Sequence, residues 1–140
     1  CAPTNNQFND QAKNFRISGW DSISPYDFDR IKGSLYRGFP VAVGMMVGDD
    51  FEKYKGGVFK TYETQNMSGH AMAIVGYDDN YQYTDPSNNT CVGCFIIQNS
   101  WSSTVGVSGY YVLPYTHFNY LISSGNTSQL MSCWYAVNFY

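Results

Sequence analysis

Apolar residues recur at helical spacing in one part of the chain. Between residues 24 and 38, Phe28, Ile31 and Leu35 fall on one face of a helix with 3.6 residues per turn. Ser24 suits the N-cap of such a helix, because its hydroxyl can accept a hydrogen bond from an unpaired backbone N–H group. The pattern therefore predicts one main helix over residues 24–38.

The rest of the chain is dominated by short apolar runs, which favour strands. Residues 49–59 predict only a short helical turn followed by a glycine break. The predicted strands cover residues 15–23, 39–47, 70–77, 94–100, 109–115 and 133–139. One helix and a series of strands, without a linker or a repeat, indicate a single α+β domain over residues 1–140. Its sheet is expected to be curled, mostly antiparallel and barrel-like.

Composition narrows the classes of function. Aromatic residues make up 18% of the 140 positions and charged residues only 14%, which is typical of a globular chain. With 8 Lys and Arg residues and a net charge of −3, the chain lacks the basic surface of a nucleic-acid-binding protein. No apolar run is long enough to span a bilayer, so we expect neither a nucleic-acid nor a membrane partner. Because the chain starts at Cys1 without a methionine, we expect a processed or trimmed product.

Two predicted strands begin or end in polar side chains that suit catalysis. His70 stands at the head of one apolar run, and Asn99 follows a later one. If these strands are neighbours, the amide of Asn99 can fix the tautomer and the angle of the His70 ring, as the acid does in a Ser-His-Asp site. Trp101 can then cover this contact and exclude water, which strengthens it. The alternative from the pattern alone is a core histidine that caps a strand.

Three stretches strongly resemble the second half of the papain-like cysteine proteases. They are GHAMAIVGYDD (69–79), FIIQNSW (95–101) and GVSGYYVLPYTHF (106–118). Residues 31–59 resemble the helix, the Pro-Val strand and the following Gly-Gly segment of that family, and the ending is similar to its bacterial branch. The resemblance extends over roughly residues 20–139. It implies the right-hand, barrel-like domain of a two-domain enzyme whose active site lies in the cleft between the halves.

The resemblance also implies roles for individual residues. His70 is expected to be the general base and the ion-pair partner of a thiolate, Asn99 to orient its ring, and Trp101 to shield their contact. In the pocket for the second substrate residue before the cut, Gly44 and Ala71 are expected to line the wall and Gly69 to lie at the edge. Such small residues leave room for a bulky apolar side chain of a peptide substrate.

The resemblance leaves the nucleophile to be supplied from elsewhere, because the catalytic cysteine of the family lies well before its histidine. We therefore expect an N-terminal partner chain that carries this cysteine and comes from the same precursor, a zymogen. Cys1 is expected either to form an inter-chain disulfide with that partner or to be a free terminal thiol. The alternative is a catalytically inactive papain-like module that serves in binding or as a scaffold. No cofactor is expected in either case.

The other cysteines are Cys91, Cys94 and Cys133. Cys91 and Cys94 form a Cys-x-x-Cys motif just before a predicted strand, where a local disulfide is the expected pairing. Two ligands fall short of the four that tetrahedral zinc requires, so no metal site is expected. Cys133 is expected to be a buried thiol or to pair with an unidentified partner. This use of cysteine favours an oxidising environment, either secreted or lumenal and lysosome-like.

The chain departs from the family pattern at two positions after Asn99. Ser102 stands where the family has glycine, and Val105 stands where it has a second tryptophan. Because valine is smaller than tryptophan, we expect weaker shielding of Asn99, together with atypical specificity or a degenerate enzyme. His117 is expected to be an exposed or capping residue.

Overall fold

The computed structural model describes residues 10–14, 16–59, 68–85, 87–123 and 130–139. Its main feature is a six-stranded sheet in the order β1-β6-β2-β3-β4-β5, in which every neighbouring pair is antiparallel. The strands are β1 (Ile17–Ile23), β2 (Val41–Val47), β3 (Ser68–Thr84), β4 (Thr90–Gln98), β5 (Tyr110–Pro114) and β6 (Leu130–Phe139). Cys1 and the side chain of Cys133 lie outside what the structure describes, so the expectations for them stay predictions.

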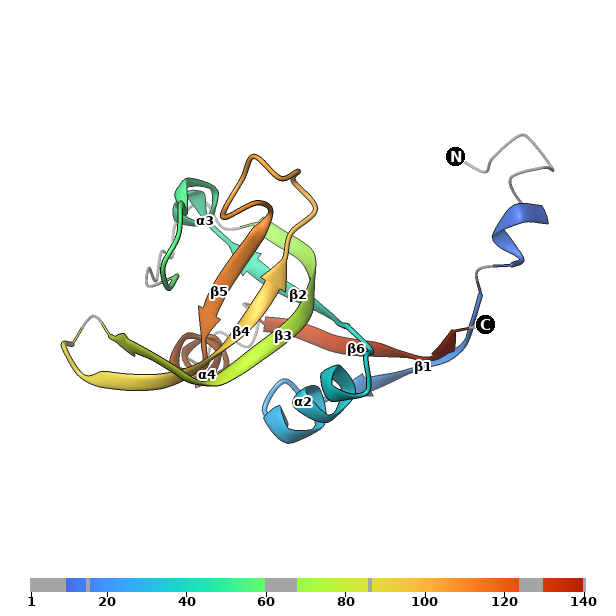
Figure 1. The fold of residues 1–140 in the computed structure, drawn as a ribbon, viewed down its shortest axis with the longest axis horizontal. Coiled ribbons are helices and arrows are strands. Elements are labelled where there is room, and N and C mark those ends of the chain that lie inside the picture. Colours follow the sequence, from blue (N-terminus) through green and yellow to red (C-terminus); the bar gives the residue numbers. More distant parts are fainter. Residues whose placement is uncertain (1–9, 15, 60–67, 86, 124–129, 140) are drawn as a thin grey trace.

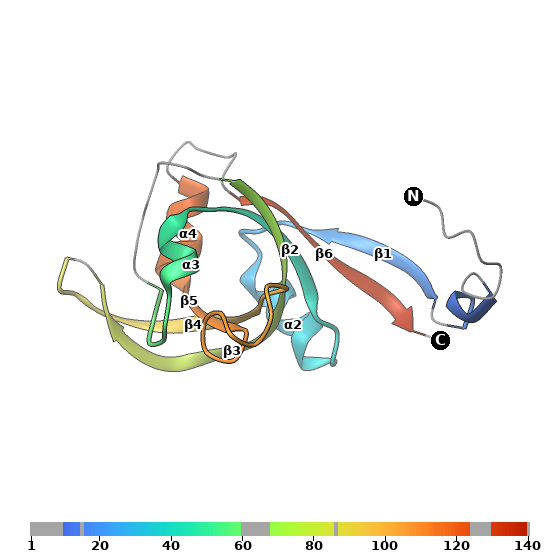
Figure 2. The same cartoon turned by 90° about the horizontal axis from the view of Figure 1, so that it is seen from above.

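The sheet is curled rather than flat. Strands β2 to β5 wrap around a common interior, whereas β1 and β6 run side by side away from it (Figure 1). Seen from above, β2 and β3 curve over one side of this interior, and β4 and β5 continue the wall (Figure 2). Alternation explains how β2 forms part of the wall, because Val41, Val43, Met45 and Val47 are buried while the residues between them are more exposed. The expected α+β class with a barrel-like antiparallel sheet is confirmed.

Three labelled helices flank the sheet: α2 (Phe28–Tyr36), α3 (Asp49–Lys53) and α4 (Tyr115–Ser123). Helix α2 packs against β2 and β3, and α4 packs against β4 and β5. Helix α4 begins directly where β5 ends, and the sequence patterns did not predict it. Among the described residues, no helix is long and apolar enough to cross a membrane.

The start of α2 differs from the sequence expectation. The carboxylate of Asp27 accepts a hydrogen bond from the backbone N–H of Arg30 at 3.0 Å, so Asp27 is the N-cap. Ser24 belongs instead to a turn before the helix, in which its carbonyl accepts a hydrogen bond from the N–H of Asp27 at 2.9 Å. The prediction of Ser24 as the cap was therefore wrong, because the turn that starts at Ser24 moves the N-cap three residues along the chain, to Asp27.

Aromatic rings join the helices to the sheet. Phe28 of α2, Phe95 of β4 and Phe118 of α4 have ring centroids between 5.2 and 5.7 Å apart and meet edge to face. On the other side of the interior, Phe51 of α3 stacks on Tyr111 of β5 with centroids 4.0 Å apart. These contacts fix α3 and β5 next to each other, close to the end of the sheet where His70 and Asn99 lie.

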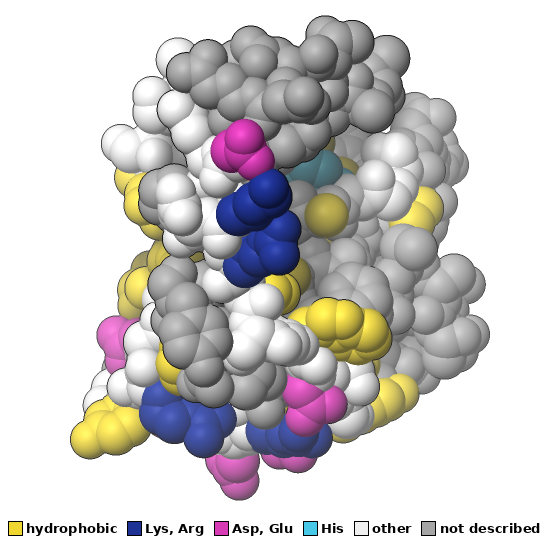
Figure 3. All heavy atoms as spheres, turned by 90° about the vertical axis from the view of Figure 1, so that its right-hand side faces the viewer, with side chains coloured by type: hydrophobic (Ala, Val, Ile, Leu, Met, Phe, Trp, Pro, Cys, Tyr) yellow, Lys and Arg dark blue, Asp and Glu magenta, His cyan; other side chains and the backbone are white. Residues whose placement is uncertain are grey.

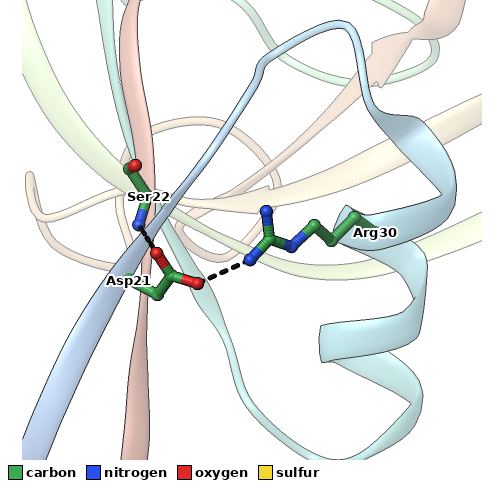
Figure 4. Close-up of polar contacts among 3 residues, drawn as sticks. All are labelled: Asp21, Ser22 and Arg30. Atoms are coloured by element: carbon green, nitrogen blue, oxygen red, sulfur yellow. Dashed lines mark hydrogen bonds and ion pairs between the residues drawn. The ribbon is translucent and has the colours of Figure 1, made fainter.

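Charged residues on the surface are mixed in sign. Viewed from the side of β1 and β6, lysine and arginine side chains lie next to acidic ones (Figure 3). One such pair joins β1 to α2, where the guanidinium of Arg30 donates to the Asp21 carboxylate at 2.5 Å (Figure 4). The other oxygen of that carboxylate accepts a hydrogen bond from the N–H of Ser22. Asp21 and Arg30 are about half exposed, so this pair orients the helix but adds little stability.

Candidate active site

Strand pairing brings His70 and Asn99 to the same edge of the sheet. His70 is the third residue of β3, and Asn99 directly follows β4. Ala73 and Gln98 are cross-strand partners, so Asn99, the next residue after Gln98, lies opposite Met72. His70 is two residues from Met72 in β3 and therefore on the same face of the sheet. The backbone N–H of Asn99 donates to the carbonyl of Gly109 at 2.9 Å, which continues the pairing toward β5.

The two side chains are in direct contact. Nε2 of His70 lies 2.7 Å from Oδ1 of Asn99, as the sequence predicted. The backbone N–H of Ser100 donates to the same oxygen, also at 2.7 Å. This second bond identifies the oxygen end of the amide, because the amide nitrogen cannot accept a hydrogen bond. An oxygen can only accept, so Nε2 of His70 carries the hydrogen and Nδ1 of the neutral ring is left as the acceptor.

Trp101 covers this contact. Its ring stacks on the His70 ring with centroids 4.3 Å apart and planes 26° apart, and it meets Phe51 edge to face at 5.9 Å. Trp101 therefore lies against the ring of His70. Stacking against a large aromatic surface limits rotation of the imidazole and keeps water from one of its faces.

The residues that depart from the family pattern fit this loop in different ways. Ser102 has a backbone φ of +81°, a conformation that favours glycine, and its hydroxyl lies 2.7 Å from that of Thr104. Val105 is partly buried and packs against the hydrophobic core. Ser102 thus adopts a conformation that favours glycine, the residue expected there from the family pattern, and Val105 packs against the core.

The three residues expected to line a substrate pocket lie together at this edge. Gly44 and Ala71 are direct partners across β2 and β3, and Gly69 pairs with Met46 two positions further along. Ala71 lines an open depression of about 320 Å³, which also has Asn99 and Gln98 in its wall. Gly44 and Gly69 are not among the residues that line this depression. The structure therefore places Ala71, and not the two glycines, at the hollow beside the catalytic candidates.

The sequence patterns did not single out Ser100 or Tyr111. Ser100 contributes only its backbone N–H, for which no side-chain signal exists. Tyr111 is fully buried with its hydroxyl near Asn99, and burial raises the pKa of that hydroxyl while the Asn99 amide opposes the shift. The only sequence signal for Tyr111 was its place in an alternating strand, which predicts burial but not a polar contact.

The Cys-x-x-Cys motif does not contain the expected disulfide. Cys91 and Cys94 are both free thiols within β4, and they pair with Tyr83 and Asp78 of β3. Three residues of extended strand span roughly 10 Å, whereas a disulfide requires Cα atoms within about 7 Å. The strand begins at Thr90 rather than at Cys94, so it extends through the whole motif and keeps the two sulfur atoms apart.

Neither thiol is placed for the chemistry of His70. Asp78, the partner of Cys94, lies eight positions along β3 from His70, and Cys91 is further still. Burial and the nearby Asp78 carboxylate also raise the pKa of the Cys94 thiol, which disfavours a reactive thiolate. In the part of the chain that the structure describes, no three His, Cys, Asp or Glu side chains gather as metal ligands.

His117 lies in α4 and takes no part in this site. It is only 3% exposed, and its ring meets Phe59 edge to face with centroids 5.1 Å apart. Burial lowers the pKa of His117 to about 4, although the Asp50 carboxylate acts in the opposite direction. The expectation of an exposed or capping residue was wrong, because the helix that buries His117 was itself not predicted.

Comparison with known proteins places this geometry in a family. The model of the family described as "Papain family cysteine protease" matches residues 2–130. Cathepsin B-like CP1 of Giardia intestinalis is 34% identical over 98 residues, which cover 69% of this chain and 29% of that protein. Cathepsin B-like protease 1 of Arabidopsis thaliana is 28% identical over 109 residues, which cover 76% of this chain and 25% of that protein. The chain spans less than a third of the length of these relatives.

A solved structure shows the same fold. The bromelain protease of Ananas comosus, in complex with the E64 inhibitor, matches with a TM-score of 0.60 and 20% identity, and the match covers 86% of this chain and 50% of that one. Because the family model extends over nearly all of the sequence, with the paired histidine and asparagine at the expected edge of the sheet, the chain belongs to the papain family of cysteine proteases.

Proposed function

We propose that this chain supplies the general base and the orienting amide of a cysteine peptidase. The observation that carries the proposal is the 2.7 Å contact between Nε2 of His70 and Oδ1 of Asn99. An imidazole held in one tautomer, with its other nitrogen available as an acceptor, is the partner that a catalytic thiol requires. The names of the cathepsin B-like relatives support the same reaction class.

In the proposed reaction, a thiol lies beside Nδ1 of His70 and gives up its proton to that nitrogen. The thiolate attacks the carbonyl carbon of a peptide bond, and the imidazolium then gives the proton to the leaving amine. Water, deprotonated by the same nitrogen, releases the acid product from the acyl-enzyme. Asn99 accepts the Nε2 hydrogen bond throughout, which stabilises the imidazolium when it forms.

The thiol is proposed to come from a partner chain of the same precursor. Support comes from the positions of Cys91 and Cys94 in β4, whose partners in β3 are at least eight residues from His70. We further propose that Cys1 forms the inter-chain disulfide, and that the protein acts in a secreted or lysosome-like lumenal compartment. The open depression at Ala71 is proposed to accept a bulky apolar side chain of the peptide substrate, with the small residues Gly44 and Gly69 lying beside it on β2 and β3.

The test is a variant of the base with a matched control. His70→Ala removes the imidazole, and Gln82→Ala changes an exposed residue of the same strand, β3. The protein carrying this chain is treated with an electrophilic thiol-directed peptide probe and assayed for peptide cleavage. Loss of a general base lowers the rate by roughly 10² to 10⁴, so His70→Ala should lose labelling and cleavage while Gln82→Ala keeps both. Full activity in His70→Ala would rule the proposal out.

The alternative function is a binding or scaffold module without catalysis. It is favoured by the replacement of a family tryptophan by Val105 and by the absence of a thiol beside His70 among the described residues. Intact-mass measurement before and after reduction separates the two. A second polypeptide released by the reductant supports the two-chain enzyme. A single species of 15.8 kDa, unchanged by the reductant and not labelled by the thiol-directed probe, supports the module.

A further inference from the structure

Two buried polar atoms next to the His70–Asn99 contact have no hydrogen-bond partner. Nδ2 of Asn99 and the hydroxyl oxygen of Tyr111 are both inaccessible to water, and neither is paired within the described part of the chain. A buried polar group without a partner is costly, so two such groups at one site require an explanation. One of them is a donor with two N–H groups, and the other can accept.

The sheet places these two groups on the same side. Tyr111 of β5 is the cross-strand partner of Ile97 in β4, and Asn99 lies two residues beyond Ile97, so all three face the interior. Residues on diagonal positions of neighbouring strands remain within reach of a long aromatic side chain. The hydroxyl of Tyr111 thus extends toward the amide that contacts His70.

The Tyr111 ring is held firmly. It stacks between Phe51, with centroids 4.0 Å apart, and Tyr54, with centroids 4.7 Å apart. Its edge also lies against Gly106, where an added Cβ atom would come within 2.8 Å of the ring. A phenol fixed on both faces and at one edge is a rigid support for a hydrogen bond.

We propose that Tyr111 is a positioning residue, whose hydroxyl oxygen accepts a hydrogen bond from Nδ2 of Asn99 and thereby keeps Oδ1 directed at His70. The opposite orientation of the amide would turn its N–H groups toward the N–H of Ser100 and the ring of His70. Tyr111 and Ser100 therefore select the same orientation from opposite ends of the amide. The opposing influence of the Asn99 amide on the pKa of the Tyr111 hydroxyl agrees with an N–H group directed at that oxygen.

The hydrogen bond between Asn99 and Tyr111 has a catalytic role only if the proposed function holds, but the bond itself can be measured without catalysis. The test uses the ¹⁵N-labelled chain and two variants that each remove one phenolic oxygen. Tyr111→Phe removes the buried hydroxyl and leaves the ring. Tyr110→Phe removes the hydroxyl of the neighbouring residue in β5, which is 41% exposed and on the other face.

The readouts are the ring ¹⁵N shifts of His70 and the exchange of the Asn99 side-chain NH₂ protons with water. In Tyr111→Phe we expect NH₂ exchange to accelerate roughly threefold to tenfold, as for one lost hydrogen bond, and the His70 shifts to move toward a mixture of tautomers. Tyr110→Phe should leave both unchanged. A purely structural role of Tyr111 would lower stability without moving the His70 ring shifts.

Two results would overturn the proposal. One is that Tyr111→Phe behaves like Tyr110→Phe in both readouts. The other needs no variant: in the unmodified chain, the Asn99 NH₂ protons would exchange as fast as those of Asn80, an exposed asparagine of β3. If the Asn99–Tyr111 hydrogen bond is present but His70→Ala retains full peptidase activity, the proposed function fails and the hydrogen bond has a structural role only.

Discussion

Replacing His117 by phenylalanine should remove a pH-dependent loss of stability. His117 is buried in α4 against Phe59, and burial lowers its pKa to about 4. The unfolded chain has an ordinary histidine pKa of about 6.5. As the pH falls below about 6.5, the unfolded state takes up a proton while the folded state does not, so the folded state is destabilised until the pH reaches about 4. Phenylalanine is apolar, similar in size and has no such proton.

The size of the effect follows from the two pKa values of His117. A folded pKa of about 4 against about 6.5 in the unfolded chain lowers the free energy of unfolding by about 2 kcal/mol between pH 7 and pH 5, and by about 3 kcal/mol below pH 4. This change matters for the proposed lysosome-like location, because small domains are only marginally stable. Urea unfolding of both proteins at a series of pH values measures it directly.

The comparison contains its own control. Above about pH 7, where histidine is neutral in both states, any difference between the proteins reports packing of the new ring alone. Below that pH, the unmodified chain should lose stability more steeply than His117→Phe. Parallel loss in the two proteins would refute the reasoning, because it would mean that His117 takes up its proton as easily when folded as when unfolded.

Three further variants test packing, one beside His70 and two at glycines elsewhere in the chain. Trp101→Ala should lower the free energy of unfolding by about 2 to 4 kcal/mol and accelerate exchange of the His70 Nε2 proton, because it removes the ring that stacks on His70 at 4.3 Å and meets Phe51 edge to face at 5.9 Å. Unchanged exchange would mean that Trp101 does not shield the contact. Gly93→Ala should destabilise the chain by about 2 kcal/mol or more, because its φ is +92° and a Cβ would lie 2.3 Å from Tyr115. Gly33→Ala in α2, where an added Cβ meets open space, should instead stabilise the chain by about 0.5 to 1 kcal/mol. Equal urea midpoints for the Gly93 and Gly33 variants would contradict the crowding at Gly93.

The catalytic candidates could be predicted because their signals are local. His70 and Asn99 each stand where an apolar run meets polar residues, and antiparallel pairing of neighbouring strands is enough to bring them together. Trp101 follows from its place two residues after Asn99. The strands themselves were found for the same reason, since alternation or continuous burial within each run does not depend on distant parts of the chain.

The features that were missed depend on contacts between distant segments. Helix α4 follows Pro114 without a loop, and its aromatic and β-branched residues also suit a strand, so propensity alone did not separate the two. The burial of His117 then follows from a contact with Phe59, far away in sequence. The absent Cys91–Cys94 disulfide has the same origin, because pairing with β3 extends β4 through the motif.

The departures near Asn99 show why a changed motif does not by itself indicate a lost site. Ser102 has a positive φ, which costs a residue other than glycine about 1 kcal/mol, and Trp101 still reaches the His70 ring. The orientation of the amide depends on the N–H of Ser100 and, as we propose, on Tyr111. Neither of these partners is altered by Val105. The groups that hold the tautomer of His70 are therefore separate from the groups that shield it, and a sequence can change the second set while the first stays intact.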